Sequence, residues 1–274
     1  MTAGTSPRNI LSRIVEARRA AVAHRQRVLP LVALKIAVEK KAPPARNFHD
    51  ALTPAPWNII AELKKASPSR GLLREEYQPA VLAPLFEQAG AAAISVLTEE
   101  DFFQGSLAHL KEARQAAQIP ILRKDFIVDP WQVWEARAAG ADSFLLIVAI
   151  LTDDELNELL VLGRQLGMEP LTEVHTREEL ARAIEAGASI IGVNNRNLRS
   201  LEVRLETSFE LVEAIPEDCV AVSESGIRSR DDLERLSRAG FDAFLIGEHL
   251  MSHPDPGEAL REFVAAALPK RAAP

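Results

Sequence analysis

Glu62 and Lys64 end a run of apolar residues that has the composition of a buried strand. Alternate side chains of a strand face the same side, so this acid and this base project together. A Ser-Pro-Ser-Arg-Gly turn follows at residues 67–71, and its hydroxyl and backbone donors suit an anion. The combination predicts the rim of an α/β active site that performs acid–base chemistry. The alternative is an exposed ion pair at a strand end, which contributes little to stability.

Polar residues recur where the other apolar segments end. Each has a structural explanation on its own; Lys124 and Glu173, for example, could form a satisfied ion pair. Apolar residues fill the rest of these segments, however, so charge is confined to their ends. The residues found in this way are Thr98, Lys124, Glu173, Asn194, Ser225 and Gly247. We therefore expect one polar rim to which several strands contribute.

A repeated pattern along the chain indicates which elements position that rim. Four times, a helical pattern ends at a glycine and a buried strand follows at once; the glycines are Gly90, Gly140, Gly187 and Gly240. Their spacing of about 50 residues is twice the length of one strand–helix unit, and further strands are expected between them at 57–63, 119–124, 168–174 and 220–224. Eight such units predict a (β/α)8 TIM barrel, whose chemistry lies at the carboxyl ends of the strands. An open doubly wound sheet is the alternative, but no Gly-x-Gly-x-x-Gly follows any predicted strand.

Several helix starts can also be located. Thr152 and Thr176 are each followed three residues later by a glutamate, which is the pattern of a capping box. The dipeptide Asp129-Pro130 and the polar run at 229–232 are further start signals.

The exits from the last two predicted strands, at 223–227 and 245–248, are short and contain glycine. Backbone amides at such exits, with a helix N-terminus behind them, form the usual phosphate site of these barrels. Glu248 argues against this assignment, because it must point outward or the anion must bind elsewhere. The residues alone predict a barrel enzyme that acts on a phosphorylated metabolite through Lys and Glu, without a metal or a cofactor.

The N-terminal segment differs in charge from the rest of the chain. Residues 1–46 hold ten Lys or Arg against two acids, although the whole chain has a net charge of −7. Apolar residues recur at helical spacing between Ile10 and Leu31, so we expect a helical extension over 1–46 packed on a barrel of residues 47–274, with its arginines in solvent. The alternative is an arm that binds nucleic acid; we expect no nucleic-acid partner.

Composition narrows the cellular setting. The single cysteine, Cys219, excludes an internal disulfide and fits a reducing cytoplasm. Residues 1–9 lack the apolar core of a signal peptide, and no apolar run is long enough to span a membrane. We therefore expect a cytoplasmic protein without a membrane partner.

Six segments, in order along the chain, together resemble the indole-3-glycerol phosphate synthase family of tryptophan biosynthesis. They are residues 60–71, 95–98 with 103–106, 122–126, 172–175, 192–198 and 223–227. The resemblance implies conversion of 1-(2-carboxyphenylamino)-1-deoxyribulose 5-phosphate into indole-3-glycerol phosphate, carbon dioxide and water. It covers the barrel and the N-terminal extension.

The resemblance also implies roles for individual residues. Lys124 matches the general acid, and Lys64, oriented by Glu62, matches a second lysine that holds the substrate carboxylate and assists proton transfer. Glu173 matches the carboxylate that stabilises the positive nitrogen and acts as base in the dehydration, and Asn194 matches a substrate-orienting amide. The implied binding residues are Ser67, Ser225, Gly226 and Gly247 for the phosphate, Arg196 for the anthranilate carboxylate, and Phe103, Phe126 and Leu198 for the anthranilate ring. Arg196 could equally be a structural ion pair, and the last three could equally be core residues.

Other functions remain as alternatives. Phosphoribosylanthranilate isomerase is a sister barrel whose acid–base pair is a cysteine and an aspartate at early strands. The single cysteine of this chain, Cys219, begins a predicted strand at the opposite face of the barrel, which argues against isomerase chemistry. A phosphate-binding regulatory module would tolerate loss of Lys64, Lys124 or Glu173, and all three are present. The partner expected is the small phosphorylated substrate, with a weak association with other tryptophan-pathway enzymes.

Overall fold

The computed structural model describes residues 10–54, 57–198 and 200–264. Eight parallel strands close into a barrel in the order β1-β10-β9-β8-β7-β6-β5-β4, with β4 paired to β1. The strands are β1 (Asn58–Leu63), β4 (Ala93–Leu97), β5 (Ile121–Lys124), β6 (Ser143–Ile147), β7 (Leu171–Val174), β8 (Ile190–Asn194), β9 (Val220–Glu224) and β10 (Ala243–Ile246). The closed barrel confirms the predicted TIM-barrel fold and excludes the open sheet.

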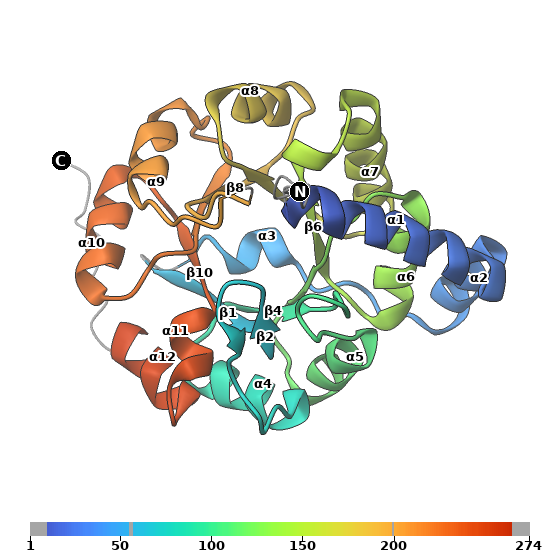
Figure 1. Ribbon diagram of the computed structural model, residues 1–274, viewed down its shortest axis with the longest axis horizontal. Helices are drawn as coiled ribbons and strands as arrows, with labels where there is room; N and C mark the ends of the chain where they lie inside the picture. Colours follow the sequence, from blue (N-terminus) through green and yellow to red (C-terminus); the bar gives the residue numbers. More distant parts are fainter. Residues whose placement is uncertain (1–9, 55–56, 199, 265–274) are drawn as a thin grey trace, which may run out of the picture.

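Helices surround the strands, as Figure 1 shows. They are α4 (Pro79–Gln88), α5 (Leu107–Ala116), α6 (Pro130–Ala139), α7 (Asp153–Gln165), α8 (Arg177–Glu185), α9 (Glu206–Leu211), α10 (Arg230–Ala239), α11 (Glu248–Ser252) and α12 (Pro256–Val264), with short 3-10 turns η1 (Val148–Ile150) and η2 (Val212–Ala214). None of the helices in the described ranges has the length and apolar character needed to cross a lipid bilayer.

Strand alternation divides the core into two layers. Residues such as Ile59, Ile121 and Phe244 face outward and pack against the helices in one large cluster. Their neighbours, such as Ile60 and Leu122, face the barrel interior in a second cluster. Burial on both faces explains why each strand reads as a continuous apolar run that becomes polar only at its end.

Local signals in the sequence mostly form the structure that they predict. The four repeat glycines adopt φ angles of 95°, 94°, 76° and 121°, which are open to glycine without strain. Thr152 and Glu155 form a capping box. At Thr176 the prediction is half wrong: its hydroxyl accepts from the Glu179 N–H, but the Glu179 carboxylate accepts from the His175 N–H instead.

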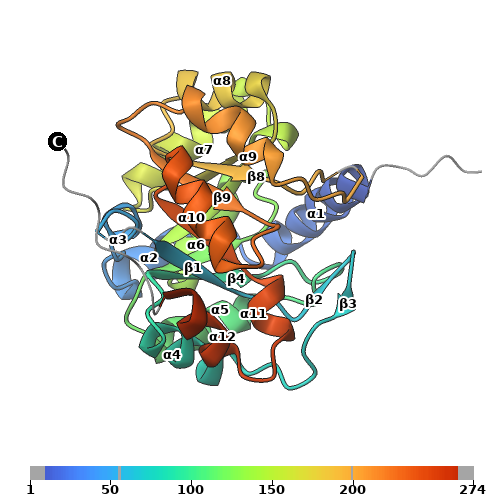
Figure 2. The same ribbon diagram turned by 90° about the vertical axis from the view of Figure 1, so that its left-hand side faces the viewer.

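Within residues 10–54, three helices precede the barrel: α1 (Ile10–Val28), α2 (Leu31–Lys41) and α3 (Phe48–Ala51). Figure 2 shows α1 at the same end of the barrel as a hairpin formed by β2 (Ala66–Ser67) and β3 (Gly71–Leu72), with α3 at the other end. Leu11 and Ile14 of α1 join the interior cluster at that end. Two side chains of the extension differ from what was expected: Arg18 is buried rather than solvated, and Val28, one of the apolar residues expected to pack on the barrel, is 74% exposed.

Candidate active site

A pocket of about 420 Å³ opens at the carboxyl ends of the strands. It is lined by every residue to which the resemblance gives a role except Ser67: Glu62, Lys64, Phe103, Lys124, Phe126, Glu173, Asn194, Arg196, Leu198, Ser225, Gly226 and Gly247. Ser67 lines an adjoining recess of about 60 Å³, which shares Lys64, Phe103, Phe126, Arg196 and Leu198 with the main pocket.

Lys124 lies between two carboxylates on the barrel floor. Its Nζ is 3.1 Å from the Glu173 Oε2, and it also donates to the Glu224 Oε2. The side chains of Glu173 and Glu224 are 2% and 1% exposed. Lys124 and Glu173 therefore do form an ion pair, and Glu224 joins them as a second carboxylate.

This arrangement shifts the pKa values of all three groups. Burial alone would lower the pKa of Lys124, but the carboxylates of Glu224, Glu173 and Glu62 outweigh burial and raise it above the ordinary value. Burial raises the pKa of Glu224 to about 7 against the pull of Lys124, and the charge on Glu173 adds to that rise. Burial would do the same to Glu173, but Lys124 and His175 hold its pKa below the usual range. Within this cluster, Glu224 is the carboxyl whose pKa is raised toward neutral pH.

Glu62 and Lys64 form a second acid–base pair at the end of β1. The Lys64 Nζ is 2.5 Å from the Glu62 Oε1, and Glu62 is only 3% exposed. The exposed surface pair considered for this strand end is therefore excluded. Gly247 makes room for the pair, because a Cβ there would collide with the Glu62 side chain.

Asn194 is the last residue of β8 and Arg196 lies just after it; their contacts connect three loops. The Asn194 Oδ1 accepts from the Arg196 N–H at 2.9 Å, and the Arg196 Nη2 is 3.0 Å from the Glu248 Oε2. Glu248 also accepts from the Arg70 Nε at 2.8 Å. Of the two alternatives considered for Glu248, the outward orientation is excluded, because Glu248 lines the pocket; two guanidinium groups neutralise its charge there. Arg196 thus lines the pocket and forms a structural ion pair at the same time.

Apolar side chains form one wall of the pocket. The ring centroids of Phe103 and Phe126 lie 6.2 Å apart. Both contact the interior cluster that contains Leu11 and Ile14 of α1, and Leu198 packs against it too. Phe103, Phe126 and Leu198 therefore have both of the roles that were left open: they line the pocket and they pack against the interior cluster.

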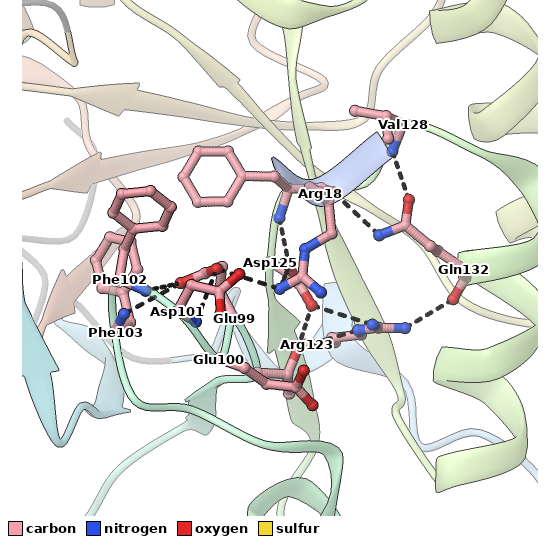
Figure 3. A network of polar contacts seen from close by, with 12 residues as sticks. Arg18, Glu99, Glu100, Asp101, Phe102, Phe103, Arg123, Asp125, Val128 and Gln132 are labelled. Atoms are coloured by element: carbon pink, nitrogen blue, oxygen red, sulfur yellow. Dashed lines mark hydrogen bonds and ion pairs between the residues drawn. The ribbon is translucent and has the colours of Figure 1, made fainter. Parts of the chain in front are cut away.

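A network of buried charges lies behind this wall (Figure 3). The Arg18 Nη2 is 3.0 Å from the Asp125 Oδ1 and 3.7 Å from the Glu99 Oε1. Arg123 contacts the other Asp125 oxygen at 3.0 Å. Thr98 donates to Asp125 as well, so this strand-end residue supports the site from behind rather than lining it.

Glu99 links that network to the pocket wall. Its carboxylate accepts from the backbone N–H groups of Asp101, Phe102 and Phe103 at 2.8–3.1 Å. The loop that carries Phe103 is thus held by the same carboxylate that Arg18 of the extension contacts.

Sequence reasoning missed Glu224 as a pocket residue. The interpretation of β9 passed over its last residue to Ser225, although a usable signal was present. Strand alternation places Val220, Val222 and Glu224 on one face, and the two valines face the barrel interior. Gly192 on the neighbouring strand β8 leaves the space that the Glu224 carboxylate fills.

The sequence is similar to those of known proteins over most of its length. A family model described as indole-3-glycerol phosphate synthase matches residues 11–263. A relative of that description from Rhodococcus opacus (strain B4) is 49% identical over 257 residues, which is 94% of this chain and 95% of the relative. Another, from Albidiferax ferrireducens, is 45% identical over 266 residues, 94% of this chain and 99% of the relative.

Solved structures show the fold. Thiamine phosphate pyrophosphorylase from Pyrococcus furiosus superposes with a TM-score of 0.57 at 19% identity, over 80% of this chain and 96% of its own. At that identity the likeness concerns the barrel alone. The family match and the two relatives confirm what the sequence motifs predicted: the chain belongs to the indole-3-glycerol phosphate synthase family.

Proposed function

We propose that Lys124 is the general acid of the reaction and Glu173 the base, with the Lys64–Glu62 pair as the second proton-transfer group. The observation that carries this proposal is the position of Lys124 on the pocket floor, bound to Glu173 and Glu224. The enzyme is a carboxy-lyase that converts 1-(2-carboxyphenylamino)-1-deoxyribulose 5-phosphate into indole-3-glycerol phosphate.

Ring closure requires the aromatic carbon that bears the carboxylate to attack the ribulose ketone. A proton donated by Lys124 to the ketone oxygen promotes this attack, because it removes negative charge as it develops. The ring carbon then loses carbon dioxide, and the remaining hydroxyl leaves as water. Glu173 stabilises the positive nitrogen through these steps and takes the proton released in the dehydration.

The substrate has two further parts that the pocket must hold. We assign the anthranilate ring to Phe103, Phe126 and Leu198, and its carboxylate to Arg196 and Lys64. Asn194 orients the substrate between them.

We assign the phosphate to Ser67, Ser225, Gly226 and Gly247. Gly226 and Ser225 have φ angles of 81° and 66°, which turn the backbone sharply where β9 ends. Inorganic phosphate should compete with the substrate for this site. Glu248→Gln should leave that competition unchanged or strengthen it, since the variant removes a negative charge near the anion.

The activity is tested by mixing the protein with the carboxyphenylaminodeoxyribulose phosphate and following indole fluorescence. Glu173→Gln should retain the fold and lose turnover by a factor on the order of 10². Near-normal turnover of Glu173→Gln would remove Glu173 from the base role.

Cellular setting and organisation are also proposals. We propose that the enzyme works in the cytoplasm. The single cysteine supports this proposal, because one cysteine cannot form an internal disulfide and fits a reducing compartment. We further propose that residues 1–46 form an extension that serves the barrel of residues 47–274. Weak association with other pathway enzymes would use exposed apolar side chains such as those of Val32 and Ile36 on α2.

A further inference from the structure

His175 follows β7 directly and lies between two carboxylates. Its Nε2 is 3.5 Å from the Glu173 Oε1, and its Nδ1 is 3.3 Å from the Glu179 Oε2. The backbone N–H of His175 donates to the same Glu179 oxygen at 2.7 Å. Its side chain is 13% exposed and does not line the pocket, so any effect on the reaction passes through the pocket carboxylates that it faces, of which Glu173 is the one in contact.

The number of ring protons follows from these contacts. A neutral imidazole carries one N–H, and its second nitrogen presents a lone pair. Since each nitrogen faces a carboxylate oxygen, a neutral ring would set a lone pair against a buried anion. The His175 Nε2 and the Glu173 Oε1 are both buried, and within the described ranges the Nε2 has no hydrogen-bond partner besides the Oε1 that it faces at 3.5 Å. One proton between them satisfies both atoms.

We propose that His175 is a positioning residue for the reaction: its imidazolium, held by Glu179, supports the Glu173 carboxylate from the side opposite Lys124. The Glu173 Oε2 then faces Lys124 while its Oε1 faces His175. The inference deepens the proposed function, because it rests on Glu173 being the base. It assigns His175 the task of keeping that base ionised and fixed in orientation.

The charges around the ring agree with this assignment. The groups that face it are Glu173 on β7, Glu179 on α8 and Glu224 on β9, with Lys124 beyond Glu173. Burial opposes protonation, but the hydrogen bond to Glu179 and the three carboxylates outweigh burial and raise the pKa of His175 above its ordinary value. The imidazolium in turn lowers the pKa of Glu173, adding to the effect of Lys124.

The first test measures the proton directly, by nitrogen NMR of the full-length protein with labelled histidine. His175→Gln identifies the signals. At pH 7.5, His175 should show two ring N–H groups, one on each nitrogen. His49, whose side chain is 35% exposed and contacts Asp50, is the control histidine away from the pocket. A single N–H on His175 at that pH would overturn the proposal, and this result does not depend on how any variant folds.

The second test follows catalysis. The pH profile of kcat/KM in His175→Gln should have its acid limb moved upward by on the order of one pH unit, because Glu173 loses a cationic neighbour. Glu179→Gln should move the limb in the same direction by less, and His49→Gln should leave it in place. A uniform loss of activity with an unmoved limb would mean that His175 is merely structural, and would overturn the proposal.

The two proposals fail in different ways. If Glu173→Gln kept its turnover, the base role would be wrong, although the His175 ring could still carry two protons. If His175 carried one proton while Glu173→Gln was inactive, only the inference about His175 would fall.

Discussion

At the scale of single residues, two lysines pair with three buried carboxylates in the pocket. Lys124 serves both Glu173 and Glu224, and Lys64 serves Glu62. An uncompensated buried carboxylate is unfavourable and takes up a proton instead. Removal of one lysine therefore changes both the chemistry and the charge of the pocket.

Lys124→Ala should lower kcat by a factor of about 10² to 10⁴, because the ketone oxygen loses its proton donor. The variant also leaves Glu173 and Glu224 without their shared cation. The double variant Lys124→Ala/Glu224→Gln also removes the Glu224 charge. Circular dichroism of both variants shows whether the two unpaired carboxylates alter the fold. Near-normal kcat in a folded Lys124→Ala protein would exclude Lys124 as the acid.

Glu224 should give the enzyme a distinctive pH dependence of stability. Its pKa is about 7 in the folded protein, above the value of about 4.3 in an unfolded chain. Its contribution to stability is fully present below about pH 4.3 and is lost as the pH rises through 7. Glu224→Gln stays neutral, so its Tm relative to the unsubstituted protein should rise between pH 5 and pH 8.

Differential scanning calorimetry at several pH values measures this trend. Glu210→Gln is the control, because the Glu210 side chain is 61% exposed, and its Tm difference should be constant. A constant difference for Glu224→Gln would show that Glu224 is already ionised at pH 5.

Much of this site follows from residue types and strand alternation. Glu62, Lys64, Lys124, Glu173 and Asn194 were found from the sequence because apolar strands end in them. The side chains that bond across the barrel were harder to place, since no local pattern shows that Lys124 reaches from β5 to Glu224 on β9. The partners of Glu248 were hidden for the same reason: Arg70 lies 178 residues away.

At the scale of elements, α1 acts as a support for two active-site loops. Arg18 reaches from α1 to Asp125, next to Lys124, and to Glu99, which holds the Phe103 loop. The guanidinium groups of Arg123 and Arg18 outweigh the effect of burial and lower the pKa of Asp125. A helix outside the barrel thereby holds in place the loops that form the pocket wall.

Arg18→Met should destabilise the protein by roughly 3 kcal/mol, because it leaves a buried carboxylate without one of its partners. KM should rise as the Phe103 loop loosens. Arg19→Met is the matched control, since the Arg19 pair with Glu155 is partly exposed and contributes at most about 1 kcal/mol. Equal unfolding free energies of the two variants in urea would contradict the supporting role of Arg18.

The β2–β3 hairpin is tied across the pocket mouth by Glu248. Arg70 on the hairpin and Arg196 after β8 both donate to Glu248. Arg70→Gln and Glu248→Gln should each speed hydrogen exchange at residues 66–72 by a few-fold, and the double variant should add little. Additive effects would show that the two side chains act independently.

At the scale of the whole molecule, the fold was predicted from its repeat. Four helix-ending glycines at even spacing predicted eight strands, and this regularity favoured a closed barrel over an open sheet. The position of α1 was less accessible, because a helix with apolar residues at regular spacing fits many surfaces. Arg18 was expected in solvent, because an arginine is rarely buried unless it is paired. Its partners, Glu99 and Asp125, lie far along the chain, so the local sequence does not reveal them.

The Arg18 contacts also bear on the order in which the chain acquires its structure. Asp125 lies more than a hundred residues after Arg18, so a ribosome releases α1 long before its partners exist. Until then the arginine must stay in water, which keeps α1 undocked. Contacts of such sequence separation close slowly. In refolding experiments, Arg18→Met should therefore speed unfolding while leaving the folding rate nearly unchanged, as expected for a helix that docks after the barrel has formed.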